Sequence, residues 1–176
     1  MLFNKATSSM DEEEQKIQFE NWLKQKIFQK QIVKQQRVAG LQSETVYEIP
    51  VVVHVVHQSD ETEGVAGNIP VGQITSQILT LNEDFRRMNA DKDQTPAMFH
   101  PDTADVKVEF VLAKRDPEGL PTNGIVRVVG NQNSYTINEA EALAANSYWP
   151  AEEYLNIWVA NLSGGLLGFA KFPVFK

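Results

Sequence analysis

The feature that most constrains this chain is a nearly unbroken run of apolar, mostly β-branched residues, Ile49-Pro-Val-Val-Val-His-Val-Val-His57. A strand with one face in water alternates apolar and polar residues, whereas this run is apolar at almost every position. The run therefore predicts a strand that is covered on both faces. Such strands are typical of a mostly parallel sheet with helices packed against it.

A helix is expected over residues 71–89, directly after Pro70, where a proline does not disturb the first turn. Its apolar side chains recur every three or four residues and form one stripe. The stripe consists of Ile74, Ile78, Leu81, Phe85 and Met88. We expect the helix to bury the first four of these side chains against the sheet.

Alternation and propensity predict the remaining elements. Strands are expected over residues 106–113, 124–129, 154–160 and 166–172, and a helix over residues 138–147. In the first of these strands Val106, Val108, Phe110 and Leu112 share the buried face. The order of elements predicts an α/β (or α+β) fold, in which the long helix covers one face of the sheet.

The first part of the chain reads as a helical leader. Residues 9–37 begin with the capping-box pair Ser9 and Glu12, and Gly40 offers a stop. A narrow apolar stripe suggests packing on one side only; it contains Phe19, Trp22, Leu23 and Ile27. We therefore expect residues 1–45 to be a leader or pro-segment-like region and residues 46–176 to be a separate domain.

Composition excludes several classes of function. The formal net charge of -7 disfavours nucleic acid and anionic membranes as partners. The absence of cysteine excludes disulfides and thiolate metal sites. No run reaches the roughly 18 apolar residues of a membrane span. Residues 1–10 lack an apolar stretch, so no signal peptide is expected within this chain.

The three histidines do not predict a metal site. His54 and His57 are three residues apart on one strand, so their side chains point to opposite faces, and we expect packed or hydrogen-bonded histidines. His100 is expected at the surface. The stretch Asn89-x-Asp91-x-Asp93 lacks the glycine and glutamate of a calcium loop and is interpreted as a solvated loop. We expect neither a catalytic residue nor a metal ligand in this chain.

Several short motifs together resemble pappalysin-type zinc metalloproteases of the metzincin clan. They are Ile49-Pro-Val-Val-Val-His-Val-Val-His57, Gln73-Ile-x-Ser-Gln-Ile78, Leu81-Asn-Glu-Asp-Phe85 with Asn89-x-Asp91, Asp105-Val-x-Val-Glu-Phe110, Thr122-x-Gly-Ile125, Tyr154-Leu-Asn-Ile-Trp-Val159 and Leu167-Gly-Phe-Ala-x-Phe-Pro173. Each motif is weak alone, but their order and spacing over residues 46–173 match the family.

The resemblance implies a twisted, mainly parallel sheet with a backing helix, the metzincin-like N-terminal subdomain, ending before the zinc helix. In the complete protein zinc would be the cofactor, with a peptide or protein as substrate, and the enzyme would be secreted. The motif His-Glu-x-x-His-x-x-Gly-x-x-His, which would hold the zinc, is missing from this chain. The rim strand that binds substrate would contain Leu167, Gly168, Phe169 and Ala170.

Two functions remain open from sequence. The chain is either the N-terminal fragment of a zinc-dependent endopeptidase or a non-catalytic peptide- or protein-binding module that retains the sheet and lacks the zinc half.

Overall fold

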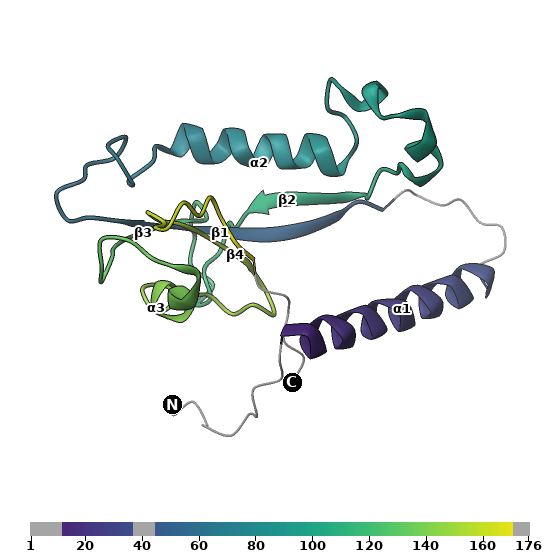
Figure 1. Ribbon diagram of the computed structural model, residues 1–176, viewed down its shortest axis with the longest axis horizontal. Helices are drawn as coiled ribbons and strands as arrows, with labels where there is room; N and C mark the ends of the chain where they lie inside the picture. Colours follow the sequence, from purple (N-terminus) through teal and green to yellow (C-terminus); the bar gives the residue numbers. More distant parts are fainter. Residues whose placement is uncertain (1–11, 37–44, 171–176) are drawn as a thin grey trace. The chain divides into compact units, whose positions relative to one another are not determined.

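The computed structural model describes residues 12–36 and 45–170 of the 176-residue chain (Figure 1). Residues 45–168 belong to one compact unit, which contains the whole sheet. The helix α1 (Glu12–Gln36) belongs to a second unit. In the described ranges no helix is both long enough and apolar enough to cross a bilayer.

Four parallel strands make up the sheet, and every pairing includes β1 (Tyr47–His57). The others are β2 (Val108–Leu112), β3 (Ile125–Val129) and β4 (Leu155–Val159). Residues 51–56 of β1 are all buried, so the strand is covered on both faces, as its sequence predicts.

The register shows that β1 is the central strand. Val51 is paired with Leu112 of β2 and also with Leu155 of β4, so β2 and β4 lie on opposite sides of β1. Val53 is paired with both β3 and β4, which places β3 on the same side as β2. On that side β2 and β3 therefore lie end to end along β1.

Gly124 makes the entry into β3 possible. Its φ of +73° is a conformation that side chains rarely adopt, and an added Cβ would lie 2.6 Å from the backbone nitrogen of Ala113. The carbonyl of Gly124 accepts a hydrogen bond from the Val53 N–H. Only glycine fits where the chain returns to β1 after leaving β2.

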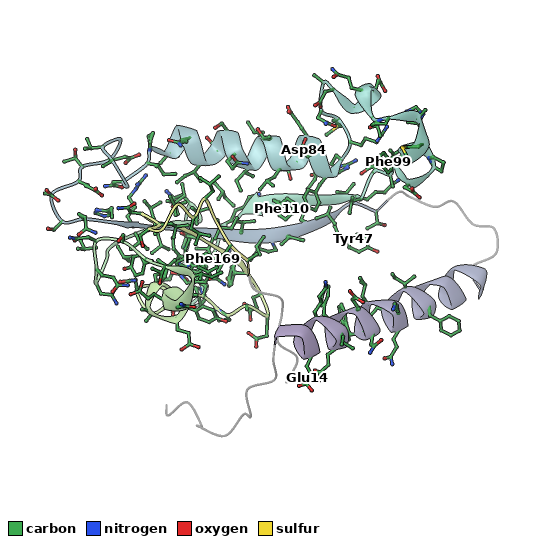
Figure 2. All side chains as sticks on the ribbon, in the orientation of Figure 1. Glu14, Tyr47, Asp84, Phe99, Phe110 and Phe169 are labelled. Atoms are coloured by element: carbon green, nitrogen blue, oxygen red, sulfur yellow. The ribbon has the colours of Figure 1, made fainter. Side chains whose placement is uncertain are left out.

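The helix α2 (Val71–Phe85) covers one face of the sheet (Figure 1). Ile74 and Ile78 are buried against a core that includes Phe110, labelled below α2 in Figure 2. Two expectations for this helix are wrong. It ends at Phe85 rather than residue 89, which leaves Met88 exposed, and Phe85 itself is 37% exposed. The Phe85 ring contacts Phe110 edge-on, with centroids 4.8 Å apart.

The early end of α2 has a local cause. The N–H groups of Arg87 and Met88 bond back to the carbonyls of Asp84 and Glu83, and Arg87 has a φ of +51°. These two bonds form a Schellman turn, in which the left-handed residue is usually glycine. The sequence has arginine there, so it gives no glycine signal for the helix end.

The opposite face of the sheet is covered by the segment between β3 and β4. Its helix α3 (Ala140–Ala144) follows a 3-10 turn over Ile137–Glu139, so it is shorter than predicted. Thr136 and Glu139 form a capping box at the start of this turn. Leu143 and Tyr135 are buried here. Two further 3-10 turns, Lys92–Gln94 and Ala97–Asp102, lie between α2 and β2.

The predicted leader helix is present as α1. The Trp22 ring stacks on Phe19 and lies 5.9 Å from the Lys26 ammonium nitrogen, and the side chains of Trp22, Leu23 and Ile27 are 38–49% exposed. The packing of this stripe stays a prediction. The expected cap and stop, Ser9 and Gly40, lie outside the described residues.

The strand expected over residues 166–172 is not observed in its described part. Residues 166–170 have no strand pairing, and residues 171 and 172 lie outside the described residues. The nearest pairing is an isolated bridge between Tyr135 and Leu162.

Candidate functional site

The four residues predicted to bind substrate are consecutive in the chain and have no strand pairing. Leu167 is fully exposed, and nothing lies within 4 Å of the position that a Cβ on Gly168 would occupy. Both belong to the unit that contains the sheet, whereas Phe169 and Ala170 are grouped with the other unit. The substrate-binding role of these residues therefore stays a prediction.

His54 is completely buried in the centre of the sheet, and both of its ring nitrogens are hydrogen-bonded. Its Nε2 lies 2.8 Å from Asn156 Oδ1, and its Nδ1 lies 2.8 Å from Ser147 Oγ. Because the Asn156 amide nitrogen donates to the carbonyls of Trp149 and Tyr154, Oδ1 is the acceptor. His54 therefore donates from Nε2 and accepts at Nδ1, as a neutral imidazole.

The surroundings of His54 are aromatic and uncharged. Its ring stacks on Trp158, with centroids 5.2 Å apart, and meets Trp149 edge-on. Burial lowers the pKa of His54, and the hydrogen bond to Asn156 offsets this only in part. The interpretation of His54 as a packed, hydrogen-bonded histidine is confirmed, and neither nitrogen is available to a metal ion.

His57 is at the carboxyl end of β1, on the strand face opposite to His54. Its Nδ1 donates to the carbonyl of Gln58 at 2.7 Å. The two histidines have no shared ligand position. Among the residues that the structure describes, no group of three or more His, Asp or Glu side chains could hold a metal ion.

His57 instead lines a pocket of about 160 Å³ where the carboxyl ends of β1, β3 and β4 converge. Each strand, or the loop directly after it, contributes to the wall. The lining residues are Val56, His57, Gln58, Glu61, Gly67, Gln132, Asn133, Tyr135 and Asn161. This pocket was not predicted from the sequence, in which the one signal for it is the set of polar residues that follow the strands.

The walls of the pocket are held by close contacts. Glu61 Oε2 accepts a hydrogen bond from the Gln58 N–H at 2.9 Å, and an added Cβ on Gly67 would lie 3.1 Å from the same oxygen. The adjoining loop is tied to β3 by Arg127, which donates to Asn68 and pairs with Glu63 at 3.1 Å. The loop after β1 is therefore fixed in place.

A second, open pocket of about 460 Å³ lies beyond the end of α2. It contains Asn89 and Asp91 of the stretch that was compared with a calcium loop, but Asp93 does not line it. Arg87 and Lys92 stand beside the carboxylates of Asp84 and Asp91 and oppose their charge. Asn89 Nδ2 donates to Asp91 Oδ1 at 2.7 Å. This mixed-charge pocket is consistent with a solvated loop.

Comparison with solved structures relates the chain to mirolysin. It is 44% identical to mature mirolysin of Tannerella forsythia in complex with a cleaved peptide, with a TM-score of 0.66. It is 45% identical to mirolysin in complex with a small compound, and 44% identical to a promirolysin variant from the same organism, each with a TM-score of 0.64. Each match covers 73% of this chain.

The fold is that of a metzincin-like N-terminal subdomain. The chain spans 42–47% of the length of these mirolysin chains, which is less than half. No protein-family model and no curated protein matches the sequence. The expected α/β class, with an open and mostly parallel sheet, is thus confirmed by the structure and by its neighbours.

Proposed function

We propose that this chain is part of the catalytic domain of a secreted, zinc-dependent endopeptidase of the pappalysin type. The observation that carries the proposal is the identity of 44–45% with mirolysin over 73% of the chain. One of these mirolysin structures contains a cleaved peptide, which supports a peptide or protein as the substrate here. The similarity gives no support to the non-catalytic binding module.

The described residues do not fit zinc by themselves. They contain no group of three potential ligand side chains, and both nitrogens of His54 are already hydrogen-bonded. Zinc-dependent sites of this clan need three protein ligands and an open position for water. We therefore assign no ligand and no proton transfer to the described part of the chain.

The substrate-binding residues proposed for the complete protein are Leu167, Gly168, Phe169 and Ala170. An extended backbone with unpaired N–H and C=O groups can accept a peptide as an added strand. Nothing lies within 4 Å of the position that a Cβ on Gly168 would occupy, and glycine has no side chain to obstruct a peptide there. Backbone pairing would hold the scissile bond extended whatever the side chains of the substrate.

The decisive experiment for the proposed function is on the coding sequence beyond Lys176. If it continues, we expect it to encode His-Glu-x-x-His-x-x-Gly-x-x-His within the next few dozen codons. The purified complete protein should hydrolyse an unstructured protein substrate, and a zinc chelator should abolish the hydrolysis. A continuation of ordinary domain length without the motif, or chelator-resistant hydrolysis, would refute the proposal.

The rim role is tested separately by Gly168→Pro in the complete protein. Proline removes a backbone donor and places a ring where the peptide would lie. We expect kcat/KM to fall roughly tenfold or more while zinc content and Tm are retained. Gly168→Ala keeps the donor and should cost less. Unchanged kcat/KM in a folded, zinc-loaded proline variant would exclude the role.

A further inference from the structure

The pocket at the carboxyl ends of β1, β3 and β4 is a candidate for a second binding site. In open sheets with parallel strands, ligands bind beyond the carboxyl ends of the strands. Three of the four strands contribute a residue to this pocket. His57 is the last residue of β1, Gln132 follows the end of β3, and Asn161 follows the end of β4. The volume of about 160 Å³ suits a small group rather than a cofactor.

Three hydrogen-bond donors of the pocket walls are already used within the protein. Gln58 Nε2 donates to the carbonyl of Gln132 at 3.1 Å, and Asn161 Nδ2 donates to the carbonyl of Asn133 at 3.2 Å. His57 Nδ1 donates to the carbonyl of Gln58 at 2.7 Å. Because the donor atom of each of these side chains is hydrogen-bonded within the protein, its acceptor atom is the one that can bind a ligand.

Six acceptor atoms remain on the lining side chains. They are His57 Nε2, Gln58 Oε1, Glu61 Oε1, Gln132 Oε1, Asn133 Oδ1 and Asn161 Oδ1, none of which has a hydrogen bond among the residues described. Gln132 Nε2 is a buried donor without a hydrogen bond of good geometry, but its proximity to Glu139 helps lower the pKa of that carboxyl. Asn133 Nδ2 is a second donor without a hydrogen bond among the residues described, so the lining offers six acceptors against two donors, and one carboxylate charge.

We propose that this pocket binds a primary ammonium group. An ammonium has three N–H donors, no acceptor and a positive charge, which complements several neutral acceptors and one carboxylate. The bound group is a lysine side chain of a protein or a free alkylamine; both have the same chemistry at the pocket. The site is separate from peptide hydrolysis, so the proposed function and this inference can fail independently.

The probe is ethylammonium chloride, titrated into the 15N-labelled chain of residues 1–176 and followed by NMR at constant ionic strength. We expect saturable shifts at the amides of Gly67 and Gln132, with a Kd of about 1–10 mM, as suits so small a ligand. Nα-acetyl-lysine methylamide distinguishes a lysine side chain from a free amine, because it binds as tightly only if the pocket accepts a side chain.

Charge and donor requirements are tested by variants and by a matched cation. Glu61→Gln keeps the bond from the Gln58 N–H and removes the charge, so the Kd should rise about tenfold or more. Asp60→Asn makes the same charge change at an exposed position of the same loop, outside the pocket lining, and should bind as the parent does. Tetramethylammonium has the charge but no donors and should not saturate.

Several outcomes would overturn the proposal. One is the lack of saturable shifts with ethylammonium up to about 100 mM, since that would mean a far weaker interaction than expected for this pocket. Equal binding of tetramethylammonium, or an unchanged Kd for ethylammonium in Glu61→Gln, would also overturn it. So would stoichiometric binding of zinc without any binding of ethylammonium. If Glu61→Gln does not fold, His57→Phe removes one acceptor and keeps an aromatic ring, and it should also weaken binding.

Discussion

The side-chain amide of Asn82 forms two hydrogen bonds with the backbone of Phe110 in β2, in the way that a neighbouring strand would. Its Oδ1 accepts from the Phe110 N–H at 2.7 Å, and its Nδ2 donates to the Phe110 carbonyl at 3.0 Å. The N–H of Tyr47 bonds to Lys107 and the N–H of Ala113 to Val51, so alternate residues of β2 face β1. Phe110 therefore presents its backbone groups to the outer edge, where the amide of Asn82 satisfies them.

Replacement of Asn82 by alanine should destabilise the fold. Phe110 is buried, so its N–H and C=O groups would lose their partners without full access to water. We expect the free energy of unfolding to fall by about 2 kcal/mol in urea denaturation. Glu83→Ala, at the exposed neighbouring position, should change it by less than about 0.5 kcal/mol. Equal effects of the two variants would show that the amide contributes nothing.

Residues of this kind are invisible to sequence patterns. Asn82 belongs to a motif that resembles the pappalysins, but its partner lies 28 residues away in the chain. An asparagine in the middle of a helix belongs to no sequence pattern that would predict such a hydrogen bond. His54, by contrast, could be interpreted correctly, because an imidazole within a buried apolar run must find partners inside the protein.

At the scale of elements, α2 shows how burial differs along one apolar stripe. Ile78 is 8% exposed and packs into the core, whereas Phe85 is 37% exposed in the last turn. Spacing alone assigned both to the buried face, because the pattern does not reveal where the sheet below the helix ends. The core beneath α2 is formed by β1 and Phe110, and Phe85 contacts only the outer part of it.

This difference can be measured by truncation. Ile78→Ala should lower the free energy of unfolding by about 3 kcal/mol, through lost burial and a cavity. Phe85→Ala should cost less, about 1–2 kcal/mol, because the exposed part of the ring contributes little. Chemical denaturation of both variants gives the comparison. A larger loss for Phe85→Ala would mean that the edge-on contact with Phe110 dominates.

The sequence predicted most elements and missed their arrangement for physical reasons. The β-branched run determined β1, and alternation located β2, β3 and β4. The end-to-end arrangement of β2 and β3 depends on the conformation of Gly124. A single glycine in the sequence does not predict the direction that the chain takes after it. The segment at 166–170 has the apolar composition of a strand, but composition does not provide a pairing partner.

At the scale of the whole molecule, His54 makes stability depend on pH. Its pKa is lower in the fold than the ordinary value of 6.5, so the unfolded chain takes up a proton first as the pH falls. The contribution to stability is present above the unfolded pKa and is lost below it. Among the residues that the structure describes, the ring contacts Ser147, Asn156, Trp149 and Trp158, none of which is charged.

We expect this linkage to lower the free energy of unfolding by up to about 1.4 kcal/mol between pH 7.5 and 5.5. Urea denaturation at the two pH values measures it, and His54→Gln should flatten the dependence while it lowers stability at both. His100→Gln, at an exposed position, should leave the dependence as it is. The same slope in His54→Gln would assign the effect to other groups.

The candidate pocket could not be predicted as a unit. Its residues come from three segments, 56–67, 132–135 and 161, which meet only because β3 and β4 flank β1. In the sequence the nearest histidine to His57 is His54, three residues away. In the structure His57 shares the wall of a pocket with Asn161, more than one hundred residues away in the sequence.

The central position of β1 also gives the chain an order of assembly. In the described sheet β2, β3 and β4 pair with β1 and never with one another, so the sheet cannot form without β1. A cut in the hairpin between Arg115 and Pro121 would divide the sheet unequally. The N-terminal piece would contain the central strand β1, its partner β2 and the helices α1 and α2, and the C-terminal piece would contain β3 and β4 without the strand that pairs with both. Only the N-terminal piece can therefore retain paired strands by itself, and the strands of the C-terminal piece can pair only after β1 has folded.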